Sequence, residues 1–245
     1  MTDQAFDADG LFDDDYLRFF AEPLEERADV ETDLIWRLLD LEPGMEVLDL
    51  GCGHGRITGR LAERGCRVTG LDVTSAFLER ARQDAAARGV PVTYVEGDMR
   101  SLPWGRRFDR VISWFTAFGY FDDEDNRRVL TEVSRVLSPG GRFAVELNNR
   151  DWIIRNFQPA SVIERDGDLM IDQRAVDPVT GRVVTERTVV RQGLVRRIPF
   201  FVRMFTFTEL RDWLLAAGFR TVTGHGDDGG PLIPDSRRMI VVART

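Results

Sequence analysis

The feature that most restricts the fold is a glycine-rich turn that directly follows a short apolar segment. Residues 46–50 are predicted to form a buried strand, and Gly51-Cys52-Gly53-His54-Gly55 then leads into a helical segment. Glycines let the backbone turn tightly and approach a ligand closely, and the start of the following helix offers free N–H groups and a positive dipole. The turn therefore predicts a ligand site at the edge of an α/β sheet.

Strands and helices alternate regularly around this turn. Segments of these lengths in this order are typical of βαβ units and a mostly parallel sheet. The predicted strands are residues 46–50, 67–71, 92–96, 108–113 and 142–147, and the predicted helices are residues 55–63, 75–88 and 122–137. Two further helices are predicted before the turn, an amphipathic one at residues 12–20 and another at about 28–39.

The pattern changes after residue 149. Apolar and polar residues alternate from about 169 to 203, and turn signals at 177–181 and 192–193 divide this stretch into about three antiparallel strands. A helix at 208–217 and strands at 221–224 and 239–243 follow. We therefore predict one doubly wound α/β domain over residues 1–245. Its parts are a helical cap (1–42), a binding core (43–149), a small antiparallel β insertion before the last helix (150–206) and a return to the sheet (207–245).

Composition narrows the possible partners. The chain has 33 basic and 41 acidic residues, a net charge of −8, which disfavours a nucleic acid held by its phosphates. Every basic residue is arginine, which excludes lysine Schiff-base chemistry. Two cysteines, Cys52 and Cys66, do not support a disulfide framework or a metal site. The sequence starts unlike a signal peptide and has no bilayer-spanning run, so we expect a cytoplasmic protein without a membrane partner.

Three aspartates follow three successive predicted strands. Asp49 ends the first strand, where its carboxylate can face a cationic amino group. Asp72 closes the second strand about 20 residues beyond the glycines, as expected for an acid that bonds a ribose diol. Asp98 follows the third, where it can accept from an adenine N–H while Met99 packs on the ring. A dinucleotide site is the alternative, although its Gly-x-Gly-x-x-Gly fingerprint would need glycine where Arg56 stands.

Several segments together resemble the class I S-adenosylmethionine-dependent methyltransferases. Residues 47–56 resemble motif I of that family, residues 68–72 its second motif and residues 96–99 its adenine loop, and nearly the whole chain is similar to bacterial small-molecule methyltransferases. The resemblance implies a seven-stranded sheet with a reversed final strand and S-adenosyl-L-methionine as cofactor. It further implies a set of cofactor contacts, which we expect at Tyr16, Arg27, Asp49, Gly51, Gly53, Gly55, Asp72, Val73, Asp98, Met99 and Trp114.

The segment after the fourth predicted strand, residues 113–121, is expected to lie beside the sulfonium, where aromatic faces attract a cation. It is not the Asp/Asn-Pro-Pro-Tyr/Phe motif with which similar enzymes hold a nucleobase or amide nitrogen. His225 is the candidate general base because imidazole titrates near neutral pH. The residues expected to face the acceptor are Phe118, Tyr120, Asn148, Arg203 and His225.

The resemblance thus implies methyl transfer to an oxygen or nitrogen atom of a small molecule by in-line displacement. O- and N-methylation both stay open, because the sequence contains no residue that must act as a base. Two alternatives are a protein that binds the cofactor without turnover and an enzyme with a macromolecular acceptor. The β insertion is expected to form a wall of the acceptor pocket or a homodimer contact.

Overall fold

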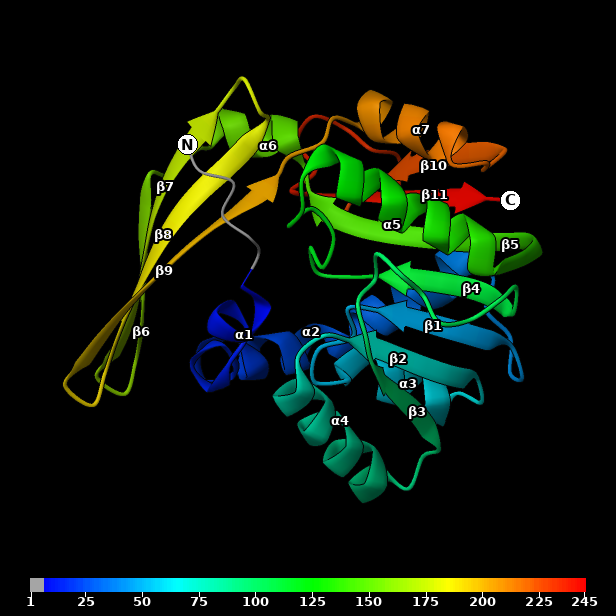
Figure 1. Cartoon of the computed structure of the whole chain (residues 1–245), viewed down its shortest axis with the longest axis horizontal. Helices are drawn as coiled ribbons and strands as arrows, with labels where there is room; N and C mark the ends of the chain where they lie inside the picture. The colour runs from blue at the N-terminus through cyan, green and yellow to red at the C-terminus, as the bar shows by residue number, and fades with distance from the viewer. Residues whose placement is uncertain (1–6) are drawn as a thin grey trace.

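The computed structural model describes residues 7–245, so residues 1–6 of the predicted cap lie outside the described residues. Its centre is a seven-stranded sheet in the order β10-β11-β5-β4-β1-β2-β3 (Figure 1). Strand β11 runs antiparallel to both neighbours and the other pairs are parallel, which confirms the predicted sheet with its reversed last strand. The strands are β1 (Glu46–Leu50), β2 (Arg67–Asp72), β3 (Val92–Glu96), β4 (Phe108–Ser113), β5 (Leu137–Asn148), β10 (Thr221–His225) and β11 (Arg238–Arg244).

Helices cover both faces of this sheet because its central strands are apolar on both sides. Neighbouring residues such as Val47 and Leu48 are both fully buried, and they belong to different cores. One core packs the sheet against α2 (Asp14–Leu39) and α3 (Arg56–Glu63), and the other packs it against α5 (Asp123–Val136) and α7 (Phe207–Ala216). Helix α4 (Ser75–Arg88) packs beside β3. Continuous apolar strands between two helical layers are the expected consequence of a parallel sheet.

The N-terminal region differs from the prediction of two helices at 12–20 and 28–39. A short helix α1 (Ala8–Leu11) is followed by α2, which runs without interruption from residue 14 to 39 and contains Pro23. Asp13 caps its start by accepting a hydrogen bond from the Tyr16 N–H. Its buried residues recur at helical spacing through the proline, at Phe19, Leu24, Ala28, Ile35 and Leu39. Packing of that face therefore keeps one helix where the sequence suggested two.

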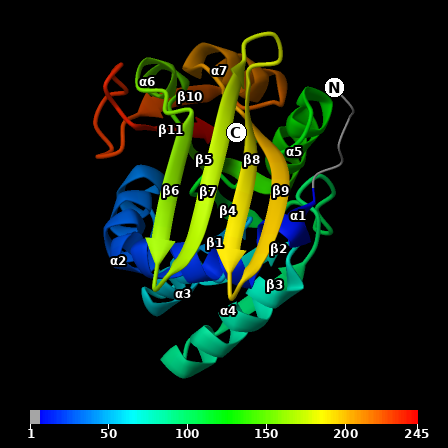
Figure 2. The ribbon, with the colours of Figure 1, turned by 90° about the vertical axis from the view of Figure 1, so that its left-hand side faces the viewer.

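The β insertion is a second sheet of four antiparallel strands, in the order β6-β7-β8-β9. It stands to one side of the main sheet, with α1 and the start of α2 between them (Figures 1 and 2). Its strands are β6 (Ala160–Arg165), β7 (Asp168–Asp177), β8 (Arg182–Arg191) and β9 (Leu194–Arg203). The prediction of about three strands missed β6, an edge strand whose adjacent Val162 and Ile163 are both exposed and so break the alternation.

Two smaller differences concern the link between the sheets. Residues 138–141, predicted as a turn, begin β5, which pairs irregularly with β4 at that point. Helix α6 (Arg150–Arg155) was not predicted; its cap is Asn149, whose side chain accepts from Asp151 N and donates to Ser236 O. Among residues 7–245, no helix combines the length and apolar character needed to cross a membrane. The predicted division of the chain at residues 42, 149 and 206 stays a prediction.

Candidate functional site

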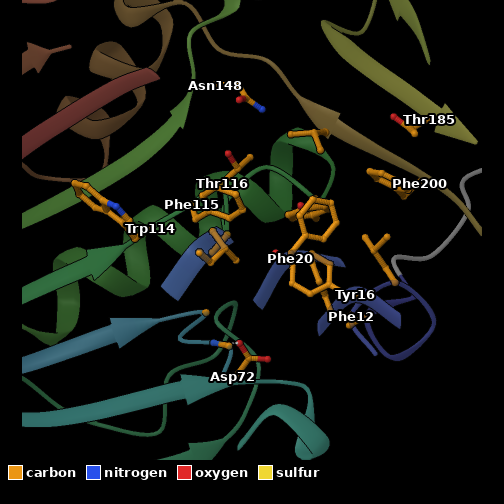
Figure 3. A pocket seen from close by; sticks show the side chains of 18 of the residues that line it. Phe12, Tyr16, Phe20, Asp72, Trp114, Phe115, Thr116, Asn148, Thr185 and Phe200 are labelled. Atoms are coloured by element: carbon orange, nitrogen blue, oxygen red, sulfur yellow. Dashed lines mark hydrogen bonds between the residues drawn. The ribbon is translucent and has the colours of Figure 1, made fainter. Parts of the chain in front are cut away.

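A cavity of about 740 Å³ lies between the ends of the central strands, the helices α1 and α2, and the inner face of the insertion sheet. This volume is typical of small-molecule sites, which span roughly 300–1,000 Å³. In Figure 3, Asp72 lies on one side of the cavity, and Thr185 and Phe200 of the insertion sheet lie on the other. The predicted site residues that line it are Tyr16, Asp49, Gly51, Gly53, Asp72, Val73, Asp98, Met99, Trp114, Tyr120 and Asn148.

The glycine turn forms a tight cradle at one end of the cavity. Gly51, Gly53 and Gly55 all have positive φ, at 74°, 55° and 80°, which disfavours residues with a Cβ. A Cβ on Gly51 would lie 2.7 Å from the Ala117 Cβ, and one on Gly55 would lie 2.5 Å from the Tyr94 hydroxyl. Gly55 therefore shapes the turn and begins α3 although it does not line the cavity.

Two carboxylates next to this turn form no ion pair among the described residues, and the nearby Arg56 is paired with Glu31. Asp49 is buried and accepts a hydrogen bond from Thr58 Oγ1 at 2.6 Å. Burial raises the pKa of Asp49 to about 6, against the lowering effect of the Thr58 hydrogen bond. Asp72 accepts from Gly53 N at 2.8 Å and Thr74 N at 2.9 Å; burial raises its pKa although these bonds lower it. This end of the cavity therefore favours a ligand that carries positive charge.

Asp98 differs from the other two acids because it already has a partner. Arg100 Nη2 lies 2.6 Å from Asp98 Oδ2, and Arg100 Nη1 lies 2.6 Å from Asp125 Oδ2. Burial, which raises the pKa of Asp98, is outweighed by these Arg100 hydrogen bonds, so its pKa is lowered. Any hydrogen bond from a ligand to Asp98 is therefore shared with a guanidinium.

The loop after β4 places two strained residues on the cavity. Phe115 and Thr116 both have φ of 58°, a conformation that is uncommon for residues other than glycine and is found at functional sites. The buried Glu146 holds them: its Oε2 accepts from Phe115 N at 2.8 Å, and its carbonyl accepts from Thr116 N at 3.0 Å. Arg238 binds the Glu146 carboxylate through two nitrogens and donates to Thr116 Oγ1 at 2.7 Å and to Asn148 Oδ1.

Aromatic rings from α1 and α2 form another wall of the cavity. Tyr16 packs between Phe12 and Phe20, with ring centroids 5.2 and 4.8 Å away, and Phe12 contacts Tyr120 at 5.5 Å (Figure 3). Burial raises the pKa of Tyr16 to about 12, and it raises that of Tyr120 as well. Both phenols therefore stay protonated at neutral pH and can donate hydrogen bonds.

Five predicted site residues lie outside the cavity lining, namely Arg27, Gly55, Phe118, Arg203 and His225. The Arg27 side chain is 55% exposed and pairs with Glu31 on the same helix. Phe118 is fully buried in the core, stacked on Phe205 at 5.5 Å. Periodicity alone did not separate these residues from their cavity-lining neighbours Tyr16 and Tyr120.

Two more of these five residues stand at strand ends. Arg203 is buried in an ion pair with Asp123 at 3.0 Å and in another with Glu209. His225 pairs with its own loop, with Nε2 3.0 Å from Thr223 Oγ1 and Nδ1 3.1 Å from Gly229 O. The geometry therefore gives no support to His225 as the general base.

Some cavity residues were missed by the sequence prediction. His54 lines the cavity with its Nε2 buried and without a hydrogen-bond partner among the described residues, and burial lowers its pKa to about 4. The insertion sheet contributes Asp172, Arg174 and Arg187. Their signal was present in the sequence: they occupy alternate positions that also carry the buried Met170 and Val189, so they belong to the inner face.

Comparison with known proteins gives a consistent result. Residues 47–141 match the profile of a family described as methyltransferase domain. The chain is 38% identical over 121 residues to demethylmenaquinone methyltransferase of Thermus thermophilus, covering 46% of this chain and 54% of that protein. It therefore spans about half the length of this relative, as it does of other relatives that it matches.

A longer match extends over most of both chains. Demethylmenaquinone methyltransferase of Clavibacter sepedonicus is 30% identical over 201 residues, which cover 79% of this chain and 75% of that protein. Among solved structures, the CcbJ methyltransferase from Streptomyces caelestis superposes with a TM-score of 0.82 at 24% identity, covering 98% of this chain and 99% of that chain. This last likeness establishes a shared fold that includes the insertion sheet.

Proposed function

We propose a function for this chain, which belongs to the class I S-adenosylmethionine-dependent methyltransferase family. It transfers a methyl group from S-adenosyl-L-methionine to an oxygen or nitrogen atom of a small-molecule acceptor. One observation carries the proposal: the buried Asp49 and the partly buried Asp72 flank a glycine cradle, and neither forms an ion pair among the described residues. A cationic ligand with a ribose fits that chemistry, because it supplies both a positive charge and hydroxyl donors.

The residues present fit this cofactor. Because Gly51 and Gly53 have no side chain, a ligand can come close to their backbone. Asp49 faces the same end of the cavity. We assign Asp49 and the glycines to the methionyl end, Asp72 with Val73 to the ribose, and Asp98 with Met99 to the adenine. Tyr16 and Trp114 complete the proposed cofactor contacts from α2 and the loop after β4.

When bound, the cofactor supplies a methyl group on a positively charged sulfur, which is already activated for displacement. The task of the protein is then to position the acceptor atom in line with that methyl group and to exclude water. The rings of Phe12, Tyr16 and Phe20 cover the cavity, and Tyr120 and Asn148 can orient an acceptor by hydrogen bonds.

Two features support a small acceptor. The acceptor part of the cavity is bounded by α1, α2 and the insertion sheet, which together form walls on several sides. Two relatives are named for demethylmenaquinone, a small molecule.

We further propose a cytoplasmic location and a homodimer through the insertion sheet, whose edge strands expose Val162 and Leu194.

The pH dependence of cofactor binding tests the proposed role of Asp49. Its pKa of about 6 means that the carboxylate is ionised at neutral pH and attracts a cationic amino group. As the pH falls through about 6 the acid becomes neutral, so we expect the affinity for S-adenosylmethionine to fall by up to about tenfold per pH unit below that point. Asp49→Asn should bind weakly with no such dependence.

The same raised pKa has the opposite effect on the stability of the protein without its cofactor, which falls as the pH rises. The stability from protonated Asp49 is fully present below its unfolded pKa of 3.8 and is lost as the pH rises through about 6. Calorimetric titration of the wild type and Asp49→Asn across this range measures the binding effect. An identical pH profile in the two proteins would contradict the assignment of Asp49.

Direct measurement of binding and turnover tests the function as a whole. Calorimetry should show binding of S-adenosylmethionine and none of NADH. Incubation with the cofactor and a metabolite extract should give a product one methylene group heavier by mass spectrometry, together with S-adenosylhomocysteine. Binding without any methylated product across extracts would favour a non-catalytic binding protein, and binding of NADH instead would overturn the proposal.

A further inference from the structure

The two ends of the cavity carry opposite charge. At the cofactor end, Asp49 and Asp72 have no ion pair to an arginine in the part of the chain that the structure describes. At the far end, the part of the insertion sheet that lines the cavity contributes one carboxylate, Asp172, between the guanidinium groups of Arg174 and Arg187. Arginine stays protonated, so two cations and one anion leave one net positive charge on this wall.

Hydrogen bonding fixes this group of three residues in place. Asp172 and Arg187 face each other across β7 and β8, and both side chains are only 8% exposed. Arg187 Nε and Nη2 donate to Asp172 Oδ1 and Oδ2 at 2.8 and 3.0 Å, and Arg174 Nη2 donates to Oδ2 at 2.7 Å. Burial, which raises the pKa of Asp172, is outweighed by these arginines, so its pKa is lowered and it stays ionised.

Most guanidinium donors of the wall remain available for a ligand. A guanidinium has five N–H groups, and the bonds to Asp172 use two from Arg187 and one from Arg174. Arg187 also lies over the rings of Phe20 and Phe200, with Cζ 5.5 and 5.1 Å from their centroids. These ring faces attract the guanidinium and help to hold Arg187 in place beside the cavity.

We propose that Arg174 and Arg187, held by Asp172, bind an anionic oxygen group of the methyl acceptor, either a carboxylate or a phosphate. This inference rests on the proposed function, because it takes the cavity beyond the cofactor as the acceptor site. The charge pattern supports it: an anionic acceptor would be attracted by this wall, and the cofactor would supply a further positive charge when bound. Guanidinium groups bind both kinds of anion through paired N–H donors.

The test measures anion binding directly, with inorganic phosphate and acetate as separate probes. Nuclear magnetic resonance of arginine side-chain Nε–H groups follows each titration at constant ionic strength, with and without S-adenosylhomocysteine. Arg174→Gln removes the excess charge while the Asp172–Arg187 pair remains, and we expect it to weaken binding of the preferred probe about tenfold. Arg174→Lys should restore part of the affinity. The probe that binds more tightly identifies the group as phosphate or carboxylate.

A matched control separates the wall from general surface charge. Arg197, on β9, is exposed and does not line the cavity, so Arg197→Gln makes the same charge change outside it and should leave phosphate affinity unchanged. If Arg174→Gln proves unstable, Thr185→Asp places a carboxylate opposite Arg174 in the strand register and should give the same loss. Equal affinities in the wild type and Arg174→Gln, or equal losses in Arg174→Gln and Arg197→Gln, would overturn the inference.

The outcome also separates this inference from the proposed function. If S-adenosylmethionine binds but the anion affinity does not depend on Arg174, the proposed anion site is wrong and the proposal of methyl transfer is unaffected. If the anion affinity depends on Arg174 but S-adenosylmethionine does not bind, the assignment of that anion to a methyl acceptor falls with the proposed function.

Discussion

Replacing Arg238 by methionine is expected to lower the free energy of unfolding by about 3–5 kcal/mol. Arg238 is the partner of Glu146, whose side chain is only 4% exposed, and the guanidinium binds both oxygens of that carboxylate. Methionine retains bulk but no charge, so the carboxylate would stay buried with the Phe115 N–H as its remaining described donor. Thr116 and Asn148 would each lose a hydrogen bond as well.

Chemical denaturation measures this effect, and two further variants control for it. Arg237→Met changes the neighbouring residue, which is exposed and has no ion pair among the described carboxylates, and should cost less than about 0.5 kcal/mol. The double variant Arg238→Met with Glu146→Met removes both charges and should recover most of the loss. A loss below about 1 kcal/mol for Arg238→Met alone would show that this ion pair does not stabilise the fold.

Asp72→Ala is expected to weaken S-adenosylmethionine binding about a hundredfold, measured by calorimetry. Two hydrogen bonds to a charged group contribute about 1.5–3 kcal/mol each, and the variant loses the proposed bonds to both ribose hydroxyls. It also removes the acceptor that binds Gly53 N and Thr74 N, so the glycine cradle loses support on the same side. Both effects lower affinity, which makes this the strongest single change expected at the cofactor end.

The control for this variant is Asp84→Ala, which removes a carboxylate on α4 that is partly exposed and pairs only with Arg80 among the described residues. It should leave the affinity unchanged. Asp72→Asn retains an oxygen that can accept from Gly53 N and should fall between wild type and alanine. Wild-type affinity in a folded Asp72→Ala protein would refute the ribose assignment.

The parallel core was predictable because its information is local. The strands of residues 92–96 and 108–113 are observed at the predicted bounds, since each is a short segment rich in β-branched and aromatic residues that follows a glycine-containing turn. The glycine turn and Asp72 were equally visible, because a tight turn after a buried strand needs glycine and brings the strand ends together.

The acceptor side was less predictable because its residues come together through long-range packing. His225 and Arg203 stand at strand ends, as functional residues often do, yet each is satisfied by partners in its own surroundings. Arg187 and Asp172 are paired by strand register, and only the burial of one sheet face shows that they point into a cavity rather than into solvent. No local sequence motif predicts an ion pair of this kind.

Helix α2 connects the two halves of the cavity, and this arrangement affects how ligands can enter and leave. Its first turns are joined to the insertion sheet through Arg18–Asp168 at 2.7 Å, and its later turns to the glycine-turn helix through Glu31–Arg56 at 2.6 Å. A helix of 26 residues spans about 39 Å, and Pro23, where a helix can bend, lies between these two joints. The half that carries the insertion sheet can therefore tilt at Pro23 while the glycine-turn half stays in place, so we expect the product to leave without prior release of the spent cofactor.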